Sequence, residues 1–174
     1  MALLIIVNGL AGAGKSTAVK EFAKKHGFVV IKQDTFLFEL NAIREPKKFL
    51  TKEQYTLAIE NMMSCVKNYM DYRRDIIIEG ALVAISKNDP LDIRQFINLG
   101  RRRRYRVKII SFTASDTVRY RRMQKKKNIV PKKIDRMLKE ATKVANEKMY
   151  NVTMLDTSNY PKKAVLKRLT RILS

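Results

Sequence analysis

The stretch ALLIIVNGLAGAGKST, residues 2–17, decides the fold because it joins an apolar run directly to a glycine-rich loop. Residues 2–7 show no polar alternation, which is typical of a parallel strand buried on both faces. Gly9 then begins the pattern Gly-x-x-x-x-Gly-Lys-Ser, and a helical pattern follows over residues 15–26. A strand before this pattern and a helix after it are the context that a phosphate-binding loop requires. We therefore predict such a loop at residues 8–17.

The residue types in the loop indicate a triphosphate ligand. The glycines let successive backbone amides point at phosphate oxygens, and the positive end of the following helix assists them. Lys15 would reach the β- and γ-phosphates, the Ser16 hydroxyl would coordinate Mg²⁺, and Thr17 would contact the α-phosphate. A glycine-rich turn without a ligand requires neither this lysine nor this hydroxyl. The predicted set for ATP and Mg²⁺ is Gly9, Gly12, Ala13, Gly14, Lys15, Ser16 and Thr17.

Beyond the loop, short β-rich runs alternate with longer helical stretches, and this order favours a doubly wound sheet. We predict strands at 2–7, 28–31, 75–80, 105–112 and 151–157, and helices at 15–26, 51–72, 115–127, 131–148 and 161–173. The predicted fold class is α/β, with three layers around a five-stranded, mainly parallel sheet. A single domain would span residues 1–174, with a helical lid near 115–133. The irregular segments 32–50 and 80–104 would form the rim of the site.

Composition bounds the setting of the protein. With 174 residues and 45% apolar content, the chain fits one compact domain. The single cysteine, Cys65, cannot form an internal disulfide, and no CxxC or Cys/His pattern around it indicates a zinc site. This fits a reducing cytoplasm. No apolar run approaches the ~20 residues of a membrane span, and the first residues do not resemble a signal peptide. We predict a cytoplasmic protein without a membrane partner.

Two acidic residues follow or end predicted strands at the edge that carries the phosphate loop. Asp34, just beyond the second strand, could accept the proton of an attacking hydroxyl and align it with the γ-phosphorus. Its alternative role is to cap a helix that begins near Thr35. Glu79, at the end of the third strand and followed by Gly80, could hold the Mg²⁺ shell. A purely structural Glu79 is the alternative.

The predicted helix after the fourth strand carries a basic face. Arg119 and Arg122 lie three residues apart and Lys126 four further on, so the three share one side of the helix. Such a face could clamp the triphosphate and stabilise charge on the transferred group, which would make both arginines catalytic. An ordinary basic surface helix is the alternative. Residues 125–127, all lysines, could be solvated or could bind the acceptor.

These residues together resemble a known family. The loop GLAGAGKST, an Asp after strand two, IIIEG in strand three, an Arg-bearing helix after strand four, and LDTSNYP near the end are similar to P-loop kinases. More narrowly, they resemble the branch that contains polynucleotide 5′-hydroxyl kinases, zeta-toxin-like kinases and chloramphenicol phosphotransferase. The resemblance spans nearly the whole chain, and its most specific part is the phosphate loop.

The resemblance implies the P-loop NTPase fold of the nucleotide-kinase type. It also implies ATP-dependent transfer to a hydroxyl, with Asp34 matching the base and Arg119 or Arg122 matching the lid arginines. It also implies that Thr157, Ser158 and Asn159 lie near adenine, although a Ser/Asn loop before Pro161 is also good capping chemistry.

One position departs from the family pattern. Polynucleotide kinases often carry an arginine three residues after the catalytic Asp, and this chain has Leu37 there. Arg44 is the nearest basic side chain downstream. The substitution puts a 5′-end kinase of the usual kind in doubt.

Charge is the remaining clue to the acceptor. The formal net charge is +21, and residues 101–133 hold 14 basic side chains against one acidic side chain. We expect this excess to lie around strand four and the lid, close to the nucleotide. A nucleic acid would gain affinity and encounter rate from it. Tyr105 and Tyr120, interleaved with arginines, could stack on bases or simply pack in the fold.

The sequence therefore predicts a phosphotransferase that acts on a hydroxyl of DNA or RNA, either a 5′ end or a modified base. Two alternatives stay open. The first is a small-molecule kinase that acts on a nucleoside, a nucleoside monophosphate or an antibiotic. The second is an ATP-gated nucleic-acid-binding module with little transfer chemistry.

Overall fold

The centre of the fold is a five-stranded sheet with the order β2-β3-β1-β4-β5, in which all neighbouring strands are parallel. The computed structural model describes residues 1–39, 50–82, 93–126, 130–148 and 151–173. The strands are β1 (Leu3–Gly9), β2 (Val29–Lys32), β3 (Ile76–Gly80), β4 (Arg106–Thr113) and β5 (Val152–Asp156). The predicted doubly wound α/β fold is thus confirmed.

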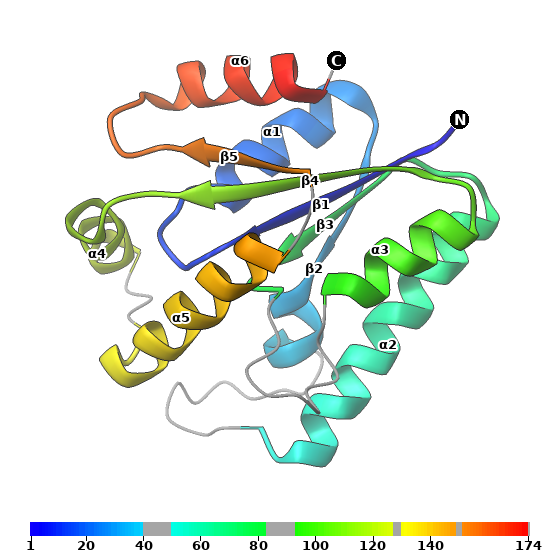
Figure 1. The fold of residues 1–174 in the computed structure, drawn as a ribbon, viewed down its shortest axis with the longest axis horizontal. Coiled ribbons are helices and arrows are strands. Elements are labelled where there is room, and N and C mark those ends of the chain that lie inside the picture. Colours follow the sequence, from blue (N-terminus) through cyan, green and yellow to red (C-terminus); the bar gives the residue numbers. More distant parts are fainter. Residues whose placement is uncertain (40–49, 83–92, 127–129, 149–150, 174) are drawn as a thin grey trace.

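Helices cover both faces of the sheet (Figure 1). One face carries α1 (Lys15–His26) and α6 (Lys162–Leu173); the other carries α2 (Lys52–Asp71), α3 (Ile93–Arg102) and α5 (Lys132–Lys148). A short helix, α4 (Asp116–Lys125), lies beyond the carboxyl end of β4. Within the described ranges, no helix combines the length and the apolar character needed to cross a bilayer.

The core lies on both sides of β1 because side chains alternate between the two faces of a strand. Leu4 and Ile6 pack with α2 and α3, whereas Ile5 and Val7 pack with α1 and α6. All four side chains are buried, which explains the unbroken apolar run in the sequence. The crevice at the carboxyl end of β1 lies where the strand order reverses, the place where open α/β sheets bind ligands.

The structure adds two elements to the predicted set. Helix α3 lies in the segment 80–104, which we expected to be irregular, and its Gly100 obscured the helical signal. A Cβ at Gly100 would lie 2.7 Å from a Leu4 methyl carbon and 2.8 Å from a Val107 methyl carbon, so glycine lets α3 approach the sheet. The second element is the π-helical turn η1 (Thr35–Glu39), which directly follows Asp34.

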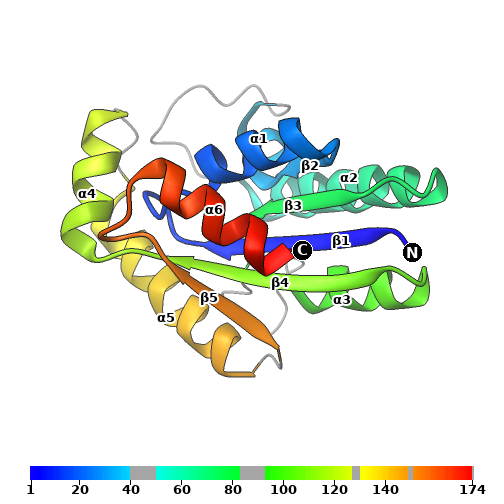
Figure 2. The same cartoon turned by 90° about the horizontal axis from the view of Figure 1, so that it is seen from above.

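The expected position of the charge needs correction. The arginine run 101–104 precedes β4, so it lies at the amino end of the sheet, together with the connection from α2 to β3. Figure 2 shows these connections at the end opposite to α4 and the phosphate loop. In a parallel sheet, the residues before a strand lie at the amino ends of the strands, and the residues after it lie at their carboxyl ends. The arginine run therefore lies far from the predicted nucleotide site.

Candidate active site

The phosphate loop curls tightly between β1 and α1, and its glycines make close contacts that other residues could not. Gly9 has φ +141°, and a Cβ there would lie 2.4 Å from the Phe112 carbonyl oxygen. Gly12 has φ +77°, and a Cβ would lie 2.6 Å from the Arg119 carbonyl oxygen. Helix α1 begins at Lys15 without an acidic residue in its first turn, so its amino-terminal amides and dipole favour an anion.

Lys15 is held inside the curl of the loop. Its ammonium nitrogen donates to the carbonyl oxygens of Gly9, at 2.6 Å, and Leu10, at 3.1 Å. Burial lowers the pKa of this ammonium, while the nearby carboxylates of Glu79 and Asp34 act in the opposite direction. Lys15, Glu79 and Asp34 thus share one electrostatic environment at the carboxyl ends of β1, β3 and β2.

The Ser16 hydroxyl donates a hydrogen bond to Glu79 Oε1, which joins the first turn of α1 to the end of β3. The Glu79 side chain is only 5% exposed, and its Oε2 has no hydrogen-bond partner in the described part of the chain. A buried carboxylate oxygen without a partner beside a hydroxyl is a donor set that suits Mg²⁺. Among the described residues no three His, Cys, Asp or Glu side chains converge. The fit is therefore to an ion that also takes ligands from phosphate and water, as Mg²⁺ does.

Asp34 lies at the carboxyl end of β2, and its side chain is exposed. It directly precedes η1, so the capping role stays open beside the catalytic one. Gln33 is buried, and its Oε1 accepts a 2.8 Å hydrogen bond from the Ala81 amide. Because this side chain passes over Gly80, where a Cβ would lie 2.3 Å from Gln33 Oε1, it ties the ends of β2 and β3 together next to Asp34.

Arg119 is buried behind the phosphate loop, with 1% exposure. Its Nε donates to the Ala11 carbonyl oxygen at 2.9 Å, and its two terminal nitrogens bind the carboxylates of Asp116 and Asp135. Tyr120 donates to the other Asp135 oxygen at 2.9 Å. Arg119 thus stabilises the backbone of the phosphate loop through Ala11. Its contact with a triphosphate stays a prediction.

Arg122 joins the phosphate loop to the end of β5. Its guanidinium donates to the Gly12 carbonyl oxygen, to the Thr157 hydroxyl and to the Thr157 carbonyl oxygen, at 3.3, 2.9 and 2.9 Å. Thr157 is buried, and its hydroxyl lies 2.9 Å from the Ala13 carbonyl oxygen. The predicted face of α4 with Arg119 and Arg122 therefore exists, and it packs on the backbone of the loop.

The sequence matches, over residues 4–147, the model of a family described as an AAA domain (AAA_33). The chain belongs to this family. A search of curated proteins finds no match.

Solved structures share the fold over nearly the whole chain. A sugar kinase from Janibacter sp. HTCC2649 has a TM-score of 0.66 at 18% identity, with 99% of this chain and 95% of that chain covered. A gluconokinase from Sinorhizobium meliloti 1021 gives 0.65 at 14%, with 98% and 91% covered. The YorR protein from Bacillus subtilis, in complex with phosphorylated GDP, gives 0.62 at 20%, with 98% and 95% covered. These likenesses confirm the P-loop kinase-like fold of this AAA-domain protein, and they give no support to the polynucleotide kinase branch.

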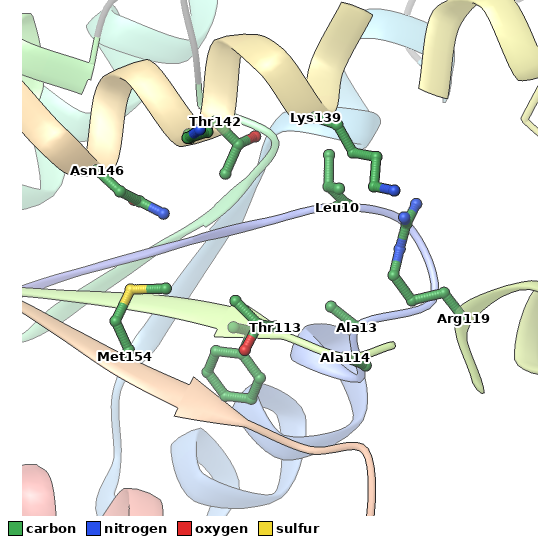
Figure 3. A pocket seen from close by; sticks show the side chains of 11 residues that line it. Leu10, Ala13, Thr113, Ala114, Arg119, Lys139, Thr142, Asn146 and Met154 are labelled. Carbon is green, nitrogen blue, oxygen red and sulfur yellow. The ribbon is translucent and has the colours of Figure 1, made fainter. Parts of the chain in front are cut away.

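A cavity of about 500 Å³ adjoins the phosphate loop between α5 and the ends of β4 and β5 (Figure 3). Leu10 and Ala13 of the loop line one side, and Thr142 and Asn146 project into it from α5. The Asn146 amide nitrogen donates to the Ser111 hydroxyl at 3.1 Å, whereas its buried Oδ1 has no hydrogen-bond partner among the described residues. Leu10, which lines the cavity, also accepts a hydrogen bond from the Lys15 ammonium through its carbonyl oxygen.

Other residues singled out in the sequence have mainly structural contacts. Ser158 accepts a 2.8 Å hydrogen bond from the Ser115 amide and binds Asp156, so it links the loops after β4 and β5; its proximity to adenine stays a prediction. Tyr105 is buried, and its hydroxyl donates to the carbonyl oxygens of Met70 and Arg74, which excludes base stacking and confirms the packing alternative. Leu37 belongs to the core.

Some predictions concern side chains at the surface or outside the described residues. Lys125 and Lys126 are exposed, and Asn159 is exposed as well. Arg44 and Lys127 lie outside the described residues. Thr17 is half-buried in the first turn of α1.

Sequence reasoning missed Asp135 and Gln33. Asp135 is 2% exposed and holds Arg119, and a signal was available because it is an acid within the basic run KKIDRM. Gln33 directly precedes Asp34, but nothing local indicates that its side chain crosses to β3.

Proposed function

We propose that this protein is an ATP-dependent kinase that transfers the γ-phosphate to a hydroxyl group of a small molecule. The observation that carries the proposal is the convergence of Lys15, the Ser16–Glu79 pair and Asp34 around a phosphate loop at one edge of the sheet. Each of these groups has a defined task in phosphoryl transfer.

In the proposed reaction, the loop amides and the amino terminus of α1 bind the phosphates of ATP, and Lys15 neutralises charge on the β- and γ-phosphates. Ser16 and Glu79 would hold Mg²⁺, which supplies further neutralisation of phosphate charge when bound. Asp34 accepts the proton of the acceptor hydroxyl while its oxygen bonds to the γ-phosphorus. The bond from phosphorus to the β,γ-bridging oxygen breaks, so the products are ADP and a phosphate monoester.

A small acceptor is favoured over a nucleic acid by two observations. The arginine run that suggested a polyanionic acceptor lies at the opposite edge of the sheet. The structural neighbours include a sugar kinase and a gluconokinase, which fits the small-molecule alternative better than the nucleic-acid prediction.

The test is transfer of labelled γ-phosphate from ATP, with Mg²⁺, to a panel of polyols, sugars, sugar acids, nucleosides, nucleoside monophosphates and 5′-hydroxyl oligonucleotides. We expect label on one class of small acceptor, at a rate that added nucleic acid does not change. Label on the oligonucleotides alone would contradict the proposal and restore the nucleic-acid acceptor. Loss of transfer in Lys15→Met would assign the activity to this site.

A further inference from the structure

The amino edge of the sheet carries a concentrated arginine surface. Its members come from the end of α3, the connections after α2 and α3, and the first residue of β4: Arg73, Arg74, Arg101, Arg102, Arg103, Arg104 and Arg106. All seven are exposed, and residues 71–75 and 101–106 include no lysine and only two acids, Asp71 and Asp75. Lysine would serve solubility as well as arginine does, whereas the planar guanidinium is suited to binding phosphate oxygens in pairs.

Two of these arginines occupy positions where glycine is the usual residue. Helices α2 and α3 both end in Schellman turns, in which the amides of Arg74 and Tyr105 bind the carbonyl oxygens of Tyr69 and Gly100. The left-handed residues of these turns are Arg73, with φ 54°, and Arg104, with φ 58°. The left-handed residue that ends α1 is Gly27. Arginine in a strained position at two neighbouring turns indicates that its side chain has a use there.

The two turns are fixed side by side. The Arg73 guanidinium donates to the Arg103 carbonyl oxygen at 2.9 Å, and Arg103 forms an ion pair with Asp71. The buried Tyr105 hydroxyl binds the carbonyl oxygens of Met70 and Arg74 across the same gap. These contacts fix the backbone that carries the arginines. Less conformational entropy is therefore lost when a ligand binds to them.

An exposed aromatic ring lies within the arginine surface. Tyr72, which is 80% exposed, is the C-cap residue of α2 and directly precedes Arg73. Rings among arginines are the means by which proteins bind single strands, because bases stack on the rings while cations follow the phosphates.

We infer that the arginine surface binds single-stranded RNA or DNA, at a site separate from the phosphate loop and independent of the acceptor. The proposal does not depend on the kinase reaction, because the arginine surface and the candidate active site lie at opposite ends of the sheet.

The test measures fluorescence anisotropy of labelled single-stranded RNA, single-stranded DNA and duplex DNA on the full chain, at about 50 mM and about 200 mM salt. We expect single strands to bind more tightly than the duplex, binding to weaken as salt rises, and ATP not to compete. In the variant with Arg73→Gly and Arg104→Gly we expect about tenfold weaker binding and a salt slope lower by about two. Thermal unfolding should occur at about the same temperature, because the relief of left-handed strain by glycine offsets the loss of the hydrogen bond from Arg73 to the Arg103 carbonyl oxygen.

Tyr72→Ala should weaken single-strand binding about tenfold without changing the salt slope. Tyr160→Ala, at another exposed tyrosine, and the pair Lys20→Gln with Lys163→Gln, at exposed lysines of α1 and α6, are the matched controls and should bind as the parent does. Absence of binding at low salt, equal binding by the Arg73/Arg104 variant, or preference for vesicles of anionic lipid over oligonucleotides would overturn the inference.

Discussion

Arg119 and Asp135 form a buried ion pair that connects α4 to α5 directly behind the phosphate loop. Their side chains are 1% and 2% exposed, and Arg119 passes the restraint on to the loop through the Ala11 carbonyl oxygen. The shape of the loop therefore depends on a carboxylate that meets no substrate in this account.

Asp135→Asn removes one charge of this pair while preserving its shape. Loss of one partner of a buried pair leaves an uncompensated charge, so we expect a loss of about 3 kcal/mol in the free energy of unfolding. Asp116 still faces Arg119, but it is exposed and does not replace the buried partner. Chemical denaturation measures the loss, and Glu140→Gln, in an exposed pair with Arg136, is the control. An unchanged midpoint would show that the pair does not support the fold.

Glu79→Gln tests the proposed Mg²⁺ site. The amide has the shape of the carboxylate but carries no charge, so we expect the Mg²⁺ concentration for half-maximal activity to rise about tenfold or more. ATP binding without Mg²⁺ should change little, since the loop and Lys15 remain. The measurement is initial rate against Mg²⁺ concentration, and an unchanged dependence would assign Glu79 the structural role.

The pH dependence of ATP affinity reports on Lys15. Because burial lowers the pKa of its ammonium in the free protein, the charge that binds phosphate is lost as pH rises through that lowered pKa. An ordinary lysine has a pKa of about 10.4. We therefore expect ATP affinity to begin to fall at a lower pH than it would if Lys15 had this ordinary pKa. Calorimetric titration between about pH 7 and about pH 10 measures it. Lys15→Met should show weak affinity without this pH dependence, and a parallel pH dependence in both proteins would contradict the assignment.

Asn146→Leu tests which of the two substrates, the acceptor or ATP, uses the cavity beside the phosphate loop. The change removes the buried Oδ1, so we expect KM for the substrate that occupies the cavity to rise about tenfold while KM for the other substrate stays the same. Lys143 is exposed, lies on the same helix and also lines the cavity. Lys143→Gln is therefore the comparison variant, which removes a charge from the cavity lining but keeps the Asn146 amide. Equal rises in both KM values would mean that Asn146 supports the fold rather than the binding of one substrate.

The strongest local patterns carried the sequence predictions. The phosphate loop and the five strands could be predicted because their residue types suit only a few backbone conformations, as Gly12 and the run from Leu4 to Val7 show. Helix α3 could not, because Gly100 weakens its intrinsic propensity and the compensation comes from packing against Leu4 and Val107.

Contacts between distant residues could not be predicted in the same way. Arg119 finds Asp135 only when α5 folds back beside α4, and Thr157 finds Ala13 from the far end of the chain. The position of the arginine run was open to prediction, however, because residues that precede a parallel strand lie at its amino edge. The density of charge in this run favoured a nucleic-acid acceptor, which the similar solved structures do not support.

The role of Asp34 is tested by comparing Asp34→Asn with the parent protein in two assays, γ-phosphate transfer to the best small acceptor and ATP binding by calorimetry. If Asp34 is the base at the phosphate loop, kcat falls by about 10²-fold or more while ATP affinity is unchanged. Asp71→Asn, at an exposed aspartate on the opposite edge of the sheet, should keep full turnover. Full turnover in Asp34→Asn would contradict the proposed reaction, because the proton of the acceptor hydroxyl would then go to another group.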